Sequence, residues 1–125
     1  MIDAFISKTS DEYVMVVKDE TKAPTVQKNL RLAFSSSAEG PYSEASEPIS
    51  PEGLWVEGPS IVKAGGQWII YYDAYTEGYM GAIASEDLGS WSDITDQVSF
   101  PSGTRHGTVF RVTEEIFSGL EELAP

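Results

Sequence analysis

The chain contains no cysteine and a single histidine, His106, among its 125 residues. Disulfides and thiolate metal sites are therefore excluded, and one histidine sets no ligand spacing for a metal. The lack of cysteine does not decide the cellular compartment, so the localisation stays unassigned.

Basic residues are scarce. Eight Lys and Arg stand against 20 Asp and Glu, which gives a net charge of −12. Because phosphate binding needs Lys and Arg, we expect no nucleic acid as a partner. An anionic membrane surface is disfavoured for the same reason. Neutral carbohydrate is compatible with this charge.

Long apolar runs are also missing. No stretch approaches the roughly 20 residues of a transmembrane helix, and Met1 is followed at once by Ile2 and Asp3 rather than by the basic start and apolar run of a signal peptide. The chain lacks a phosphate-binding glycine loop, a nucleophile elbow, a zinc motif and an EF-hand. Its hydrophobic content of 41% is enough for a packed core, and the length suits one small domain, residues 1–125.

Two parts of the chain resemble each other at a spacing of about fifty residues. The matching segments are 2–6 with 57–62, 12–19 with 67–73, and 34–43 with 83–92. Self-similarity at a period of about 40–50 residues, with several short strands in each unit, is typical of β-propeller blades. We predict an all-β fold with repeat units at about 1–50 and 55–100. Since a propeller typically needs four or more blades, two units predict part of a ring.

The apolar patterning predicts the elements of each unit. Strands are expected at about 4–8, 12–18, 29–36 and 42–43 in the first unit, and at about 58–63, 67–73, 79–85 and 90–94 in the second. Ala64-Gly65-Gly66, between two apolar runs, is expected to form a hairpin turn. Residues 44–54, rich in Ser and Pro, are expected to link the units. The closing segment, about 104–125, is expected to hold a strand at 107–112 and a helix at 114–122 that Thr113 caps.

Each unit opens with an acid, Asp3 in the first and Glu57 in the second. Radial repeats aim equivalent positions at a common centre, so the two carboxylates are expected to share one site. The apolar residues beside Glu57, Trp55 and Val56, predict a raised pKa, which a proton donor requires. Gly58 would let another group approach closely. The alternative, a solvated acid on an edge strand, fits the pattern about equally well.

Further side chains could take part in such a site. Arg105 can hold a carboxylate or sugar hydroxyls through its fork, although a surface ion pair is the simpler interpretation. Aromatic faces such as those of Trp55, Tyr75 and Tyr79 stack on sugar rings, and core packing uses the same residues. A lone histidine such as His106 is more often an ordinary hydrogen-bonded residue than a metal ligand. Asp19 and Asp73, each at the end of a strand, are expected to brace loops, and Trp68 is expected in the core.

Three runs together resemble glycoside hydrolase family 43. They are Ile2-Asp3-Ala4-Phe5-Ile6, Trp55-Val56-Glu57-Gly58-Pro59-Ser60 and Gly103-Thr104-Arg105-His106-Gly107-Thr108-Val109. The family includes β-xylosidases, α-L-arabinofuranosidases and arabinanases on a five-bladed β-propeller. The runs occur in the expected order over nearly the whole chain.

The resemblance implies roles for four residues. Glu57 is similar to the general acid, and Asp3 to the residue that tunes its pKa and orients the sugar. Arg105 is expected to contact substrate, with Trp55 and Tyr75 as further substrate-binding candidates. His106 is similar to the histidine of the central channel, which in many members lies beside a calcium ion or a water. No cofactor is required for the hydrolysis that the resemblance implies.

One part of the family pattern is missing. The general base, an Asp of the first blade, has no match, and inversion needs both carboxylates about 6.5–9.5 Å apart. The chain is thus similar to the C-terminal part of an inverting glycosidase that acts on xylose- or arabinose-containing glycans. We expect it to be inactive alone.

The alternative is a non-catalytic β-rich module that binds sugar or associates with itself. An incomplete ring leaves strand edges unpaired, and such edges are adhesive. We therefore expect a homo-oligomer through these edges, or a partner that supplies the N-terminal half.

Overall fold

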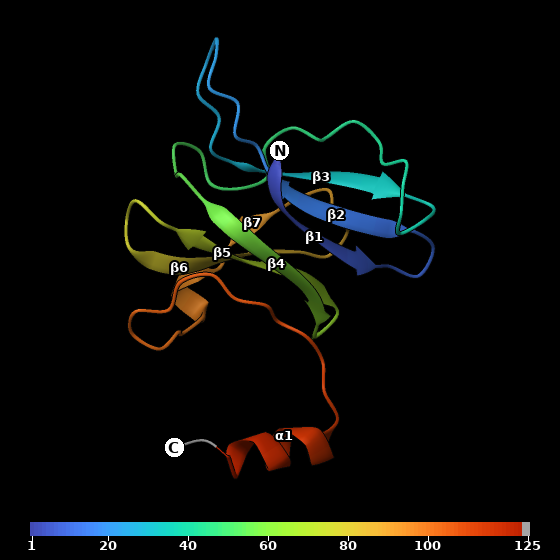
Figure 1. Ribbon diagram of the computed structural model, residues 1–125, viewed down its shortest axis with the longest axis vertical. Helices are drawn as coiled ribbons and strands as arrows, with labels where there is room; N and C mark the ends of the chain where they lie inside the picture. Colours follow the sequence, from blue (N-terminus) through green and yellow to red (C-terminus); the bar gives the residue numbers. More distant parts are fainter. Residues whose placement is uncertain (124–125) are drawn as a thin grey trace.

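The computed structural model describes residues 1–123, which form two antiparallel sheets and one short α-helix (Figure 1). The first sheet contains β1 (Ile2–Lys8), β2 (Tyr13–Lys18) and β3 (Leu30–Ser35) in that order. The second contains β4 (Glu57–Ala64), β5 (Gln67–Ala74), β6 (Tyr79–Ser85) and β7 (Ser92–Asp93). A short 3-10 helix, Thr95–Gln97, follows β7.

Each sheet is a meander in which consecutive strands pair. The β4–β5 turn contains Gly65 and Gly66 at φ angles of 58° and 88°. Two successive positive φ angles define a type I′ turn, whose twist matches that of the flanking strands. The hairpin predicted at this glycine pair is therefore confirmed.

The core lies where the two sheets pack together. The apolar run of β2 contributes Val14 and Val16, and the second sheet contributes Ile61 and Ile70, all within one buried cluster. Trp68, predicted to be a core residue, is 5% exposed and belongs to the same cluster. β1 and β4, the first strands of their sheets, lie side by side (Figure 1). Both sheets therefore contribute residues to the region between these two strands.

The short outer strand predicted at 42–43 does not form. Instead, residues 43–50 run along β3 and use serine hydroxyls to bind its backbone. The hydroxyl of Ser43 accepts from the Phe34 amide, that of Ser46 from Leu32, and that of Ser50 from Leu30. Because the hydroxyls take the place of backbone carbonyls, the segment covers the edge of β3 without becoming a regular strand. The serine-rich stretch that was predicted to be a linker is thus part of the first unit.

The closing strand predicted at 107–112 is also wrong. The amide of Val109 donates to the hydroxyl of Ser60 at 2.9 Å, and no strand is assigned in this segment. The segment runs beside β4, the edge strand of the second sheet, but contacts it through side chains rather than through a backbone ladder. The last two residues of the predicted closing segment, 124–125, lie outside the described residues.

Helix α1 (Glu114–Glu121) forms where it was predicted. The hydroxyl of Thr113 accepts from the amide of Ile116 at 3.3 Å, so the predicted cap is confirmed. The helix stands away from both sheets (Figure 1) and buries none of its residues.

The predicted β-rich class is confirmed, with sheets of three and four strands in place of two four-stranded blades. Over residues 1–123 the strands do not close a propeller ring. Within the same residues, no helix is long and apolar enough to cross a membrane.

Candidate functional site

The first strands of the two sheets, β1 and β4, are irregular at the same place. The register of β1 shifts between Ile2 and Phe5, and that of β4 shifts between Glu57 and Ser60. Ile2 faces Lys18, and Glu57 faces Asp73, so Ile2 and Glu57 occupy equivalent positions. The sequence-based match of Asp3 with Glu57 is therefore off by one residue.

The true counterpart of Asp3 is Gly58, and both have left-handed backbones, with φ of 52° and 54°. Left-handed geometry is uncommon for residues other than glycine, although Asp tolerates it better than most. Asp3 Oδ2 accepts a hydrogen bond from the Gly58 amide at 3.2 Å. The two bulges thus join the sheets, and they bring Asp3 next to the residue that follows Glu57.

Glu57 has a cationic partner that the sequence analysis missed. Lys18 Nζ, whose side chain is 1% exposed, lies 3.0 Å from Glu57 Oε2 and 2.6 Å from Glu20 Oε1. The only signal in the sequence is a lysine at the end of a dense apolar run, where the strand is buried. A buried lysine requires carboxylate partners, and the chain supplies two.

These contacts set the protonation of Glu57. Burial, the largest single influence, raises its pKa, but hydrogen bonds with His106 and Lys18 and the charge of Lys18 outweigh burial, so the pKa is lowered. The prediction of a raised pKa is therefore wrong for this structure. The apolar neighbours were identified correctly, whereas the ammonium group that faces the carboxylate could not be seen in the local sequence. Glu57 is a carboxylate here, suited to accepting hydrogen bonds.

His106 and Gly58 are packed against each other. His106 Nε2 lies 2.9 Å from Glu57 Oε1, and the backbone of His106 is left-handed, with φ of 41°. A Cβ atom added at Gly58 would lie 2.7 Å from His106 Nδ1. Gly58 was expected to allow a close approach, and the group that approaches is this imidazole. Strained backbones at Asp3 and His106, in contact with one glycine, are characteristic of functional sites.

Arg105 joins the same cluster through Asp73. Arg105 Nε donates to Asp73 Oδ2 at 2.5 Å, and the Asp73 side chain is fully buried. The guanidinium also lies 3.9 Å from Glu57 Oε1. Asp73 thus holds the loop that carries Arg105 and His106, as expected of a bracing residue. Asp19 likewise braces its own loop, because it accepts the Thr21 amide at 2.9 Å.

The two predicted aromatic residues lie beside this cluster. The ring centroids of Trp55 and Tyr75 are 6.4 Å apart, and Lys18 Nζ lies 4.6 Å from the centre of the Tyr75 ring. Trp55 is 43% exposed, and Lys28 Nζ lies 5.7 Å from the centre of its ring. Tyr79 lies elsewhere and lines a different pocket with residues 98–104.

A protein-family model described as a probable glycosyl hydrolase domain, related to glycoside hydrolase family 43, matches residues 1–117. The chain belongs to this family. The match covers both sheets and the loop that carries Arg105 and His106. No curated protein matches the chain.

The resemblance described above implied that a calcium ion or a water could lie near His106. Glu57, Asp73 and His106 offer ligand atoms within 4.8 Å of one another. These donors do not fit calcium, which takes six to eight oxygen ligands. Only two of the three residues offer oxygen, and Lys18 and Arg105 already neutralise them. Calcium in the channel of a complete ring remains a prediction.

Proposed function

We propose that the chain supplies one side of the active site of a glycosidase that acts by inversion on xylose- or arabinose-containing glycans. Glu57 serves as the general acid of the complete enzyme, and Asp3 tunes its pKa and orients the sugar. The observation that supports this proposal is the contact of the Asp3 carboxylate with the amide of Gly58, the residue that follows Glu57. The family match supports the reaction class.

The same proposal extends to the fold. The two sheets correspond to two blades of a five-bladed propeller, and β1 and β4 are the inner strands of their blades. Their adjacent bulges lie where blades of a propeller face the central axis. Further blades would come from an N-terminal half, which is the partner we propose for the catalytic form.

The described residues offer no suitable general base. The carboxylate closest to Glu57 in the cluster is Asp73, whose oxygen lies within 4.8 Å. Inversion needs a separation of about 6.5–9.5 Å with a water between the groups. Asp73 is also fully buried and bound to Arg105, so it cannot activate a water. The base must come from the complementing part of the enzyme.

The ionised state of Glu57 also predicts that the chain alone does not cleave glycans. A carboxylate with a lowered pKa has no proton to give to the leaving oxygen near neutral pH. In the complete enzyme, a second carboxylate across the sugar would raise this pKa by repulsion between like charges. The chain alone is therefore expected to bind glycans without cleaving them.

Turnover of an aryl xyloside and an aryl arabinofuranoside tests this proposal. We expect no release of the aryl group by the pure chain. Turnover that is lost in Glu57→Gln and retained in Glu12→Gln, an exposed acid in the β1–β2 turn, would overturn it.

A second function, non-catalytic glycan binding, is favoured by the exposed Trp55, which lies beside the partly buried Tyr75 and the ionised Glu57. Titration with xylose, arabinose and arabinoxylan fragments, followed by tryptophan fluorescence, measures such binding. We expect Trp55→Ala to abolish the response and Tyr79→Ala, an aromatic of similar exposure at another pocket, to keep it. The absence of a response in the wild-type chain would indicate a purely structural or self-associating module instead.

A further inference from the structure

A second cleft, away from Glu57, lies between β1, β4 and the segment 109–111, with a volume of about 520 Å³. Apolar side chains form part of its wall, among them Phe5, Trp68 and Phe110. Phe110 is 69% exposed, an unusual state for a large aromatic residue. The proposed glycan site does not account for this cleft.

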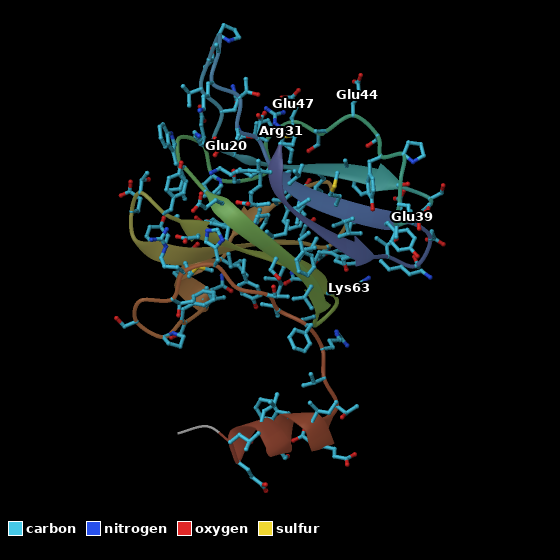
Figure 2. All side chains as sticks on the ribbon, viewed as in Figure 1. Glu20, Arg31, Glu39, Glu44, Glu47 and Lys63 are labelled. Carbon is cyan, nitrogen blue, oxygen red and sulfur yellow. The ribbon has the colours of Figure 1, made fainter. Side chains whose placement is uncertain are left out.

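Three basic residues line the same cleft: Lys8, Lys63 and Arg111. Figure 2 shows Lys63 at the end of β4 nearest the segment that leads to α1. Within residues 1–123 none of the three pairs with a carboxylate, although the chain has 20 acids for eight basic residues. The guanidinium of Arg111 donates instead to the carbonyl of Lys63. The cleft is thus a positive, partly apolar site in an acidic protein.

Helix α1 has the complementary character. Ile116, Phe117 and Leu120 share one face, and all three are exposed. Around them stand four acids, none of which is paired in the part of the chain that the structure describes: Glu114, Glu115, Glu121 and Glu122. An amphipathic helix with its apolar face in water is stable mainly when that face packs against something.

We propose that α1 of one copy docks in the basic cleft of a second copy, and that the exchange is reciprocal. The apolar face would cover Phe5 and Phe110, and the flanking glutamates would lie near Lys63 and Arg111. Each copy gives one helix and receives one, so a twofold axis closes the dimer. This inference goes beyond the proposed function and does not depend on it.

The short connection before the helix favours a second copy over the chain's own helix. Arg111 forms part of the cleft wall, and only Val112 and Thr113 separate it from Glu114. Two residues span about 7 Å, whereas an eight-residue helix is about 12 Å long. Folding the helix back on the adjacent wall requires a sharp reversal, and short hinges of this kind favour exchange between copies.

Charge also selects this surface over others. Glu44 and Glu47 lie over β3, on the side of the molecule away from α1 (Figure 2). An acidic helix is repelled there and attracted to the cleft. The dimer is therefore expected to weaken as salt concentration rises.

The test uses two full-length variants, each defective in one half of the contact. One carries Phe117→Ser and Leu120→Ser in the helix, and the other carries Lys8→Glu and Lys63→Glu in the cleft. All four side chains are exposed, so the fold should be retained, which circular dichroism would verify. By sedimentation, we expect the wild-type chain to dimerise at micromolar concentration and each variant alone to dimerise at least tenfold more weakly.

A mixture of the two variants is decisive, because one intact cleft then meets one intact helix. We expect heterodimers at concentrations where neither variant pairs with itself. The matched controls, Lys22→Glu and Val26→Ser in the exposed loop before β3, should leave the wild-type dimer unchanged. A wild-type monomer would overturn the proposal, as would a dimer that both variants retain, which would indicate pairing through strand edges. Variants that stay monomeric when mixed would overturn it too.

Discussion

The sheet β1–β3 and the sheet β4–β7 share one pairing register and carry different side chains at matching positions. Lys18 in the first corresponds to Asp73 in the second, and Asp3 corresponds to Gly58. In the pairing register, Tyr72 and Gly81 of the second sheet correspond to Val17 and Arg31 of the first. The backbone pattern, with its bulge, is repeated, whereas charge and size are not.

The differences are what create the site. Lys18 of the first sheet binds Glu57 of the second, and the carboxylate of Asp3 accepts the amide of Gly58. Had the two sheets carried the same residues, like charges would face each other across the β1–β4 contact. A repeated backbone with unequal side chains therefore yields one asymmetric cluster between two similar sheets.

The largest effect is expected at Gly81, where the second sheet places a large and a small residue side by side. A Cβ atom at Gly81 would lie 2.5 Å from the Tyr72 ring, which is fully buried. We expect Gly81→Ala to lower the free energy of unfolding by about 3 kcal/mol, because a packed core resists added volume. Urea unfolding measures the loss. Gly107→Ala, where a Cβ meets nothing within 4 Å, is the control and should cost little.

Replacement of Lys18 tests the contact between the sheets. We expect Lys18→Met to cost about 2 kcal/mol, because Glu20 and Glu57 lose their shared cation. The loss is smaller than for a fully buried pair, since both carboxylates are partly exposed and can gain water. Adding Glu57→Gln to Lys18→Met should recover part of the stability in the same unfolding assay. Equal costs for the single and double variants would contradict the role given to this pair.

Gly58 tests the equivalence of the two bulges. Gly58→Ala combines a positive φ with a contact to the His106 ring, and we expect a loss of about 1–2 kcal/mol. The His106 imidazole should also move away from Glu57, which the chemical shifts of its ring would report. Gly53→Ala has a positive φ, 77°, and open space around it, so it measures the backbone strain alone. Unchanged His106 shifts in Gly58→Ala would contradict the packing described for the site.

Removing the side-chain hydroxyl that caps the outer edge of each sheet should lower the stability by a similar amount in the two sheets. The Leu32 amide donates to Ser46 Oγ in the first sheet, and the matching Ala82 amide donates to Thr95 Oγ1 in the second. We expect Ser46→Ala and Thr95→Val each to cost about 1 kcal/mol, because each leaves a buried amide without its hydroxyl partner. A loss in one unfolding curve and none in the other would show that the outer segments are not equivalent.

The smallest expected effect is a pH dependence of the stability, which arises from Glu20, directly after β2 of the first sheet. Hydrogen bonds from Lys18 and Lys28 lower the pKa of Glu20 from 4.5 to about 2. Because the folded-state pKa lies below the unfolded one, this contribution is complete above pH 4.5 and disappears as the pH falls towards 2. Glu20→Gln should therefore flatten the stability profile in that window. Glu39→Gln, an exposed acid in the turn after β3, should leave the profile unchanged.

Much of the fold could be predicted because its signals are local. Apolar alternation located the strands, a glycine pair located the β4–β5 turn, and Thr113 with two glutamates located the start of α1. The pairing of segment 43–50 with β3 was not predicted. Its serine hydroxyls accept hydrogen bonds from the β3 amides, and the segment lacks the apolar pattern of a strand. The strand predicted at 107–112 has a strand-like pattern and lies beside the edge strand β4. Its contacts there are made by the Ser60 hydroxyl and the Arg111 guanidinium, and no backbone ladder forms, which local sequence does not reveal.

The site was predictable to a lesser degree. Repetition placed Asp3 near Glu57, although matching one acid with the other put the alignment off by one residue from the pairing register. Lys18 could not be assigned to Glu57, because the two residues lie 39 positions apart and meet only when the sheets pack. The sign of the Glu57 pKa shift depends on the contacts with His106 and Lys18, both distant in sequence, so the neighbouring residues alone predicted it wrongly.

The central claim is that Asp3, Glu57 and His106 form one sugar site between the two sheets. The most direct test is an NMR titration of the labelled chain with an arabinoxylan fragment. We expect saturable shifts at the Gly58 amide and the His106 ring, and their loss in Asp3→Ala. Shifts confined to other surfaces, or none at sugar concentrations that saturate ordinary glycan sites, would contradict the claim.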